Sequence, residues 1–263
     1  AFPQPARRAL QQRFQREQLD LAQLLHAAAQ TRRSDEKILT LRQRRRRFDR
    51  REQSVYRTVI EKQLADGELF QMQKADTLDI SEEDYYKIIY KKTASLFIAA
   101  LKSAVFSVNG TDNELKLITD YGYELGVAFQ IRDDIFDYSP SIDTGKPYGE
   151  DIRERKITLP LIEAFGVAGA EERMNIINLL LSTSFGNKET EDNLVNRVFS
   201  FVEQYNGIAS AEKKLAGHSI KAVGLVNSLQ AELERRLGSL SAAQIEALEA
   251  LRVLAVFVGK RKS

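Results

Sequence analysis

The stretch of sequence that decides the fold is Gly126-Val127-Ala128-Phe129-Gln130-Ile131-Arg132-Asp133-Asp134-Ile135-Phe136-Asp137. It contains no proline, and its apolar side chains recur at the three- and four-residue spacing that is typical of a helix. At 3.6 residues per turn, Asp133 and Asp137 lie within about 80° of Phe129 around the helix axis, whereas Asp134 lies about 140° away. We therefore expect at least two carboxylates to border the apolar side of this helix.

Carboxylates in that position are costly, because each loses hydration and residues four apart on a helix repel each other. A divalent cation removes both costs, and aspartate oxygens are the hard ligands that magnesium binds, often together with substrate phosphates. The same spacing is also typical of a solvated acidic helix end that forms ion pairs with Arg132 or Arg153. From the spacing alone both interpretations stay open.

Long segments without proline surround this helix. The five prolines are at positions 3, 5, 140, 147 and 160, so the tracts 6–139 and 161–263 contain none. Apolar residues follow helical spacing in both tracts, and no alternating run of β-branched residues indicates a strand. We predict helices at 54–75, 82–108, 112–138, 158–168, 171–183, 190–206, 208–236 and 241–260, with a loop at 139–157. The predicted fold class is all-α.

Two of these helices carry predictions about their faces. In the helix at 82–108, one face holds Tyr86, Ile89, Thr93, Leu96, Ala100 and Ala104. That face places the Thr93 hydroxyl inward with Lys92 beside it. In the last helix, one apolar stripe holds Ile245, Leu248, Leu251, Ala255 and Val258.

Basic residues accompany the acidic helix. Lys92 precedes it in the chain, and the loop after it contains Gly145-Lys146-Pro147 and Lys156. Each lysine by itself is more often a surface charge. Together with the aspartates, and with a glycine that permits close backbone approach, they indicate a pocket for an anion and a metal.

The composition excludes several classes of protein. The chain has 263 residues, of which 43% are hydrophobic and 29% charged, and its net charge is +2. It contains no cysteine and only two histidines, which excludes disulfides, thiolate metal sites and a histidine-built metal centre. No apolar run approaches the roughly 20 residues that span a bilayer, which argues against a transmembrane segment.

The first 51 residues differ from the rest. They hold thirteen arginines and one lysine against five acidic residues, a charge of +9, whereas the remainder holds 25 basic and 32 acidic residues, a charge of −7. The run Arg44–Arg47 is typical of a solvated helical surface, and also of a segment that binds phosphates or nucleic acid. A targeting peptide is disfavoured because the segment is poor in serine. We treat 1–53 as an Arg-rich N-terminal segment and 54–263 as the helical domain, within one domain overall.

Three motifs, in this order along the chain, resemble the trans-isoprenyl diphosphate synthases, or polyprenyl synthetases. Lys92-Thr93-Ala94-Ser95-Leu96-Phe97 resembles the family's Lys-Thr motif. The stretch 126–137 resembles its second aspartate-rich motif, and Gly145-Lys146-Pro147 with the residues up to Pro160 resembles the loop that follows. The resemblance extends from about Val55 to the last helix.

The resemblance implies the isoprenoid synthase fold, a bundle of antiparallel helices around a deep central cavity, in a cytoplasmic homodimer. The implied reaction condenses isopentenyl diphosphate with an allylic diphosphate into a longer trans-polyprenyl diphosphate. Asp133, Asp134 and Asp137 would bind Mg²⁺. Lys92, Thr93, Gln130, Lys146 and Lys156 would face the allylic diphosphate, and Lys92, Asp133 and Lys146 would take part in catalysis.

The family's first Asp-Asp-x-x-Asp motif, which Arg-Arg-Gly follows, is not visible in this sequence. The segment Leu24–Ser34 resembles the flanks of that motif, and it places Arg32 and Arg33 as further substrate-binding residues. We expect either that the complete gene product carries the motif or that the chain is a non-catalytic regulatory subunit. Product chain length depends on residues before this motif.

Two further classes of protein fit these residues less well. Terpene cyclases share the architecture, but their second metal motif mixes Asn, Ser or Thr with Glu, so three aspartates favour chain elongation. A helical protein that binds nucleic acid or a partner through Arg44–Arg47 would have to tolerate an acidic body. We therefore expect no nucleic-acid partner.

Overall fold

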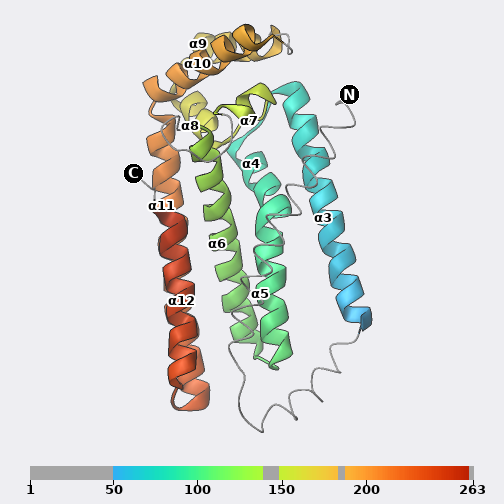
Figure 1. Cartoon of the computed structure of the whole chain (residues 1–263), viewed down its shortest axis with the longest axis vertical. Helices are drawn as coiled ribbons and strands as arrows, with labels where there is room; N and C mark the ends of the chain where they lie inside the picture. The colour runs from blue at the N-terminus through green and yellow to red at the C-terminus, as the bar shows by residue number, and fades with distance from the viewer. Residues whose placement is uncertain (1–49, 139–147, 183–186, 261–263) are drawn as a thin grey trace. The chain divides into compact units, whose positions relative to one another are not determined.

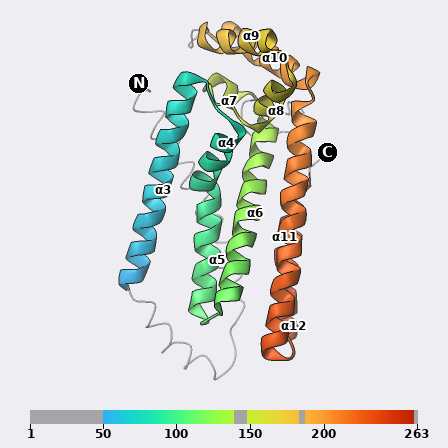
Figure 2. The same ribbon diagram turned by 180° about the vertical axis from the view of Figure 1, so that it is seen from behind.

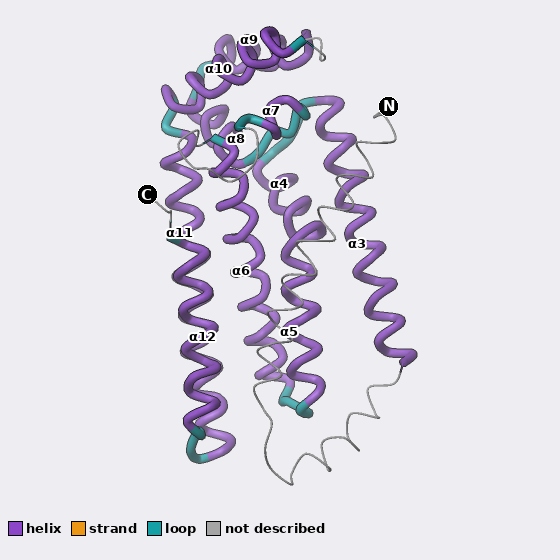
Figure 3. Tube along the Cα trace, viewed as in Figure 1, coloured by secondary structure: helices purple, strands orange, loops and turns teal. Residues whose placement is uncertain are grey.

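The computed structural model describes residues 50–138, 148–182 and 187–260, and every regular element among them is a helix (Figure 1, Figure 3). The chain divides into two units, Ala1–Asp49 and Arg50–Ser263, and all described residues belong to the second. The all-α prediction is confirmed for this part of the chain. Several residues named above lie outside it: Arg32, Arg33, Arg44–Arg47 and Lys146. The predicted domain boundary at 53/54 stays a prediction.

The helices follow the predicted order closely. They are α3 (Arg50–Thr77), α4 (Glu82–Ile89), the π-helical turn η1 (Tyr90–Ala94), α5 (Ser95–Ser107), α6 (Asp112–Asp137), α7 (Glu150–Arg153), α8 (Leu159–Val167), α9 (Ala170–Ser182), α10 (Lys188–Gln204), α11 (Gly207–Leu237) and α12 (Ala242–Gly259). The prediction of a loop over 139–157 was wrong for α7. This short helix begins after Gly149, whose φ of 73° is the left-handed conformation that glycine adopts without strain.

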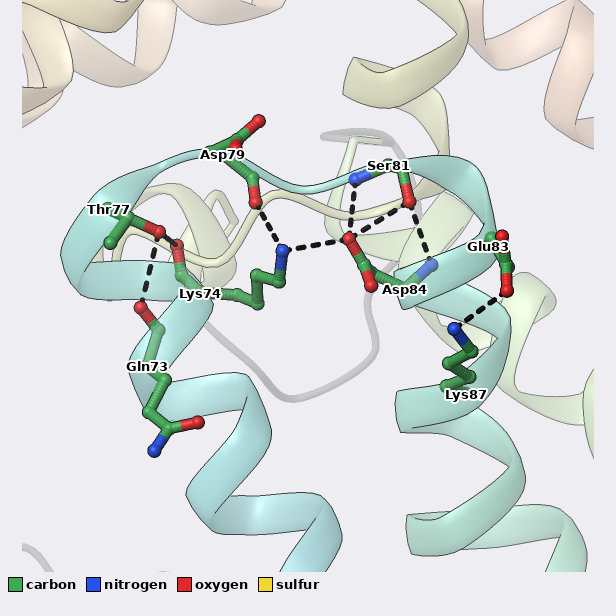
Figure 4. A network of polar contacts seen from close by, with 8 residues as sticks. All are labelled: Gln73, Lys74, Thr77, Asp79, Ser81, Glu83, Asp84 and Lys87. Carbon is green, nitrogen blue, oxygen red and sulfur yellow. Dashed lines mark hydrogen bonds and ion pairs between the residues drawn. The ribbon is translucent and has the colours of Figure 1, made fainter.

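Capping boxes fix where three of the helices begin. Ser81, Thr111 and Ser241 each accept a hydrogen bond from the backbone three residues later, and the side chain at that later position bonds back. Figure 4 shows the first box at the joint between α3 and α4. There Lys74 Nζ lies 2.9 Å from Asp84 Oδ2 and donates to the Asp79 carbonyl. The hydrogen bond from Lys74 lowers the pKa of Asp84 to about 2.

Neighbouring helices of the bundle run antiparallel. Figures 1 and 2 both place α6 between α5 and α11. Glu114, near the start of α6, pairs with Arg236 near the end of α11, whereas Glu124, further along α6, pairs with His218. Since the partners move backward along α11 as α6 advances, the two helices are antiparallel. Gly238, with a φ of 78°, ends α11 and turns the chain into α12.

Two predicted helix faces need correction. On the segment 82–107, Ala100 and Ala104 are exposed, while Ala94 and Phe97 are buried. The cause is η1, because a π-helical turn inserts an extra residue and shifts the faces of the helix that follows. On α12, Leu248, Ala255 and Val258 are buried as predicted, but Ile245 in the first turn is 50% exposed.

Two further expectations concern membranes and cavities. No helix in the described ranges has the length and apolarity needed to cross a membrane. The deep central cavity stays a prediction.

Candidate active site

The carboxylate of Asp134, in the acidic helix α6, is buried and hydrogen-bonded. It is 3% exposed, and its two oxygens accept hydrogen bonds from the Tyr85 hydroxyl at 2.6 Å and from Gln130 Nε2 at 2.9 Å. The helix-wheel expectation was therefore wrong about which aspartate faces the interior, because Asp133 is exposed. The expectation from angles around the helix axis assumed a single apolar side. However, α6 packs against α4, η1, α5 and α11, so more than one side of this helix is buried.

Gln130 connects Asp134 to the Lys-Thr segment. Thr93 Oγ1 donates to Gln130 Oε1 over 2.7 Å, so η1 and α6 share a side-chain hydrogen bond. The two backbones approach closely beside it, because Gly126 has no side chain. A Cβ atom at Gly126 would lie 2.5 Å from Ala94 Cα. The glycine in the motif thus allows the contact that brings Thr93 to Gln130.

Asp137 holds the start of α7. Its carboxylate oxygens accept hydrogen bonds from the backbone N–H groups of Glu150 at 2.9 Å and Asp151 at 3.2 Å. A carboxylate is stabilised there because the first amides of a helix point outward without partners inside it. Burial and the charge of Asp151 nevertheless raise the pKa of Asp137 to about 7. The same two causes raise the pKa of Asp134 well above its usual value.

Lys92 and Lys156, the two predicted site lysines that the structure describes, both interact with carboxylates. Lys92 Nζ is 3.0 Å from Glu68 and also donates to Gln71. Lys156 forms ion pairs with Glu154 and, at 3.5 Å, with Asp151, and the charge of Glu68 also acts on it. Burial opposes the charge of Lys156, but these carboxylates outweigh it and raise its pKa. Lys156 is therefore a cation within the cluster, and Lys92 forms an ion pair with Glu68.

Most of the predicted site residues are thus brought together by four parts of the chain: η1, α6, α7 and the segment after α7. Hydrogen bonds connect Thr93, Gln130 and Asp134, while Asp137 and Lys156 both contact Asp151. The charge of Asp151 acts on Asp134, and that of Glu68 acts on both Lys92 and Lys156, so these residues form one electrostatic cluster. Asp133 lies on the exposed side of α6 next to this cluster. Lys146, Arg32 and Arg33 lie outside the described residues.

The acidic residues suit a metal in chemistry more than in their present arrangement. Carboxylate oxygens are the donors that a hard divalent cation needs, and the raised pKa values show that the charged form of these carboxyl groups is disfavoured until a cation stabilises it. Within the described residues, however, no three histidine, aspartate or glutamate side chains form a group that could hold a metal ion. The assignment of Asp133, Asp134 and Asp137 to magnesium therefore stays a prediction.

The two arginines considered as ion-pair partners of the acidic helix end have other contacts. Arg153 pairs with Asp192 at 2.6 Å and with Glu191 at 3.8 Å, both on α10. The Arg132 guanidinium lies over three aromatic rings, and it donates to the Phe257 carbonyl at 3.3 Å. These contacts weaken the interpretation of a solvated helix end held by Arg132 or Arg153.

Sequence reasoning missed four members of the cluster: Glu68, Gln71, Tyr85 and Asp151. A signal for Tyr85 was present, because it precedes Lys92 by seven residues, or about two helical turns. Glu68 and Gln71 are three apart and share one face of α3. No local pattern, however, indicates that this face meets the Lys-Thr segment.

Comparison with known proteins identifies the family. A family model described as "Polyprenyl synthetase" matches residues 42–198. The chain belongs to the polyprenyl synthetase family. The resemblance stated from the three motifs is therefore confirmed.

Individual members of the family show how far the similarity extends. The chain is 32% identical over 200 residues to the short chain isoprenyl diphosphate synthase of Methanothermobacter thermautotrophicus, which covers 76% of this chain and 55% of that protein. It is 31% identical over 185 residues to the octaprenyl diphosphate synthase of Haemophilus influenzae, with 70% and 54% covered. The chain thus spans about half the length of these polyprenyl synthetases.

A solved polyprenyl synthase shares the fold. The enzyme of Caulobacter crescentus, whose structure is complexed with calcium and isoprenyl diphosphate, has a TM-score of 0.65 at 26% identity. The match covers 79% of this chain and 58% of that one. The predicted isoprenoid synthase fold is confirmed.

Proposed function

We propose that this polyprenyl synthetase is a trans-prenyltransferase that condenses isopentenyl diphosphate with an allylic diphosphate. The C–O bond of the allylic diphosphate breaks, and its electron pair leaves with pyrophosphate. The double bond of isopentenyl diphosphate attacks the allylic cation and forms the new C–C bond. Loss of a proton from the adjacent carbon then gives the longer trans-polyprenyl diphosphate.

The protein's part in this reaction is to bind the diphosphate and stabilise the charge that develops on it. Lys92 and Lys156 supply two ammonium groups, each now held by carboxylates. An incoming diphosphate would compete with Glu68 and Asp151 for these lysines. Thr93 and Gln130, which are hydrogen-bonded to each other, belong to the same cluster. Lys146 and the arginines Arg32 and Arg33 belong to the proposal as further substrate contacts.

The proposal includes a divalent cation, Mg²⁺, held by Asp133, Asp134 and Asp137. When bound, it would neutralise charge on the leaving diphosphate. Asp134 and Asp137 now accept hydrogen bonds through both oxygens, so a cation would compete with these donors.

The single observation that carries the proposal is the cluster itself. In a chain of this family, the Lys-Thr segment, the acidic helix and Lys156 meet through hydrogen bonds and ion pairs. A protein with only a structural role has little need for two buried carboxylates and two lysines at one place. The same proposal includes a cytoplasmic homodimer.

The test is incorporation of labelled isopentenyl diphosphate into longer prenyl chains. It uses protein expressed from the complete gene, an allylic diphosphate and magnesium. Elongation that requires all three supports the proposal. A folded protein that binds pyrophosphate but elongates no substrate would overturn the enzymatic proposal in favour of a non-catalytic regulatory subunit.

A further inference from the structure

Three hydrogen bonds in the cluster form one network that converges on Asp134. Thr93 donates to Gln130 Oε1 at 2.7 Å, Gln130 Nε2 donates to Asp134 Oδ1 at 2.9 Å, and Tyr85 donates to Asp134 Oδ2 at 2.6 Å. The bonds join α4, η1 and α6. In this arrangement both oxygens of Asp134 act as acceptors, and the amide nitrogen of Gln130 faces it. The carbonyl of Gln130 must then face Thr93, which leaves Thr93 as the donor.

The polarity has a consequence for ligand binding. A threonine hydroxyl has one hydrogen, and Thr93 donates it to Gln130. The Gln130 amide nitrogen has two hydrogens, and the described residues offer an acceptor for only one of them. The remaining N–H of Gln130 is therefore the donor that this network can present to an anion.

The cost of the pair at its centre points to a role beyond stability. Tyr85 and Asp134 are each 3% exposed, and among the described residues the hydrogen bonds to Asp134 come from two neutral groups. Burying a carboxyl group against neutral donors is expensive, and an apolar pair of similar volume would stabilise the bundle at least as well. What an apolar pair could not do is fix the orientation of the Gln130 amide.

We propose that Tyr85 and Asp134 are positioning residues, which lock the Gln130 amide so that its free N–H is directed to a diphosphate oxygen. This inference rests on the proposed function and deepens it. It assigns Tyr85 a role, and it gives Asp134 a role other than metal ligand. Tyr85 acts on the diphosphate only through Asp134 and Gln130.

The test is a double-mutant cycle on pyrophosphate binding. The dissociation constant of inorganic pyrophosphate is measured by calorimetry at one fixed magnesium concentration, for wild type, Tyr85→Phe, Gln130→Leu and the double variant. Loss of one hydrogen bond predicts binding weakened roughly 3- to 10-fold in Tyr85→Phe. Because Tyr85 acts through Gln130, the double variant should bind no more weakly than Gln130→Leu.

Tyr121→Phe is the matched control. Tyr121 is also buried, lies on α6, and donates its hydroxyl to the Leu251 carbonyl at 2.9 Å, away from the cluster. Both tyrosine variants should lower the melting temperature, but only Tyr85→Phe should weaken pyrophosphate binding. This difference separates positioning from general destabilisation.

The outcomes are distinct. Wild-type affinity in Tyr85→Phe, or losses that multiply in the double variant, would overturn the positioning role and leave the proposed function standing. A wild-type protein that does not bind pyrophosphate would overturn the proposed function and this inference with it. Asp134→Asn gives a second check, because an asparagine that donates to Gln130 permits the opposite amide orientation and should weaken binding as Tyr85→Phe does.

Discussion

At the scale of single residues, Lys92 shows how the fold prepares a charge for use. Its ammonium group lies between Glu68 and Gln71 of α3, which fix it beside Thr93. Gly67 allows this contact, because a Cβ atom there would lie 2.9 Å from Lys91 Cβ and from Lys92 Cγ. A lysine held in this way costs less to order when an anion arrives than a freely moving one.

For Lys92→Ala we expect turnover to fall by roughly 100- to 1,000-fold, the usual cost of removing one preorganised charge-stabilising group. The measurement is the rate of labelled isopentenyl diphosphate incorporation at saturating substrate. Lys116→Ala is the control, because Lys116 is an exposed lysine of α6 that pairs with Asp120. A wild-type rate in Lys92→Ala would show that this lysine is only a surface charge.

At the scale of helices, the packing of α6 on η1 depends on one glycine. Alanine at Gly126 would place its Cβ 2.5 Å from Ala94 Cα and 2.9 Å from Ala94 Cβ, so the helices would have to separate. We expect Gly126→Ala to lower the free energy of unfolding by roughly 1–3 kcal/mol, as overpacking does. Chemical denaturation measures it.

The control for this prediction is Gly217→Ala. Gly217 lies inside α11, and a Cβ atom there would meet nothing within 4 Å. Alanine should therefore stabilise that helix by up to about 1 kcal/mol. Equal stability of the two alanine variants would contradict the close contact between α6 and η1.

The joint between α3 and α4 depends on pH through Asp84 (Figure 4). Lys74 lowers the pKa of Asp84 to about 2 in the folded protein, against about 3.9 in an unfolded chain. A depressed pKa stabilises the fold above the unfolded value, and this stabilisation is lost as the pH falls from about 4 toward about 2. We expect Asp84→Asn to cost roughly 0.5–1 kcal/mol at pH 7, because solvent screens the pair, and less at pH 3.

Unfolding by urea at both pH values checks this. In a Lys74→Met background the effect of Asp84→Asn should be small at either pH, since the charge partner is gone. A cost that stays the same from pH 7 to pH 3 would show that the ion pair does not contribute.

The helices themselves were largely predictable because their signals are local. Ser81, Thr111 and Ser241 each begin a capping box, and Pro160 lies in the first turn of α8. The face of the segment 82–107 was not predictable, because nothing in the sequence marks the π-helical turn. The turn lies where η1 packs against both α3 and α6.

At the scale of the whole molecule, the site draws on contacts that no single motif contains. The acidic helix, the Lys-Thr segment and Lys156 were recognisable from their residues. The contacts of Tyr85 with Asp134 and of Glu68 with Lys92 were not, because these partners lie 49 and 24 residues apart along the chain. Spacing within one helix predicts which residues share a face, but tertiary packing decides which face is buried. Asp133 was expected beside the apolar side and is exposed, whereas Asp134 was expected away from it and is buried.

At the same scale, the stability of the entire domain should depend on a diphosphate and a divalent cation together. Asp134 and Asp137 carry raised pKa values because they are buried near Asp151, so adding a diphosphate without a cation would increase the repulsion. We therefore expect an allylic diphosphate to raise the unfolding temperature only when magnesium is present. At 100 times the dissociation constant, the ligand should add about 2.7 kcal/mol to the free energy of unfolding.

Thermal unfolding with magnesium or with excess chelator measures this dependence, and variants locate it. Asp133→Asn combined with Asp137→Asn should abolish the stabilisation by diphosphate, because it removes two of the three carboxylates proposed to hold the cation. Asp120→Asn, which changes an aspartate earlier on α6, should keep it. Equal stabilisation by diphosphate in chelator and in magnesium would show that the lysines alone bind the anion, and the aspartates would then need another explanation.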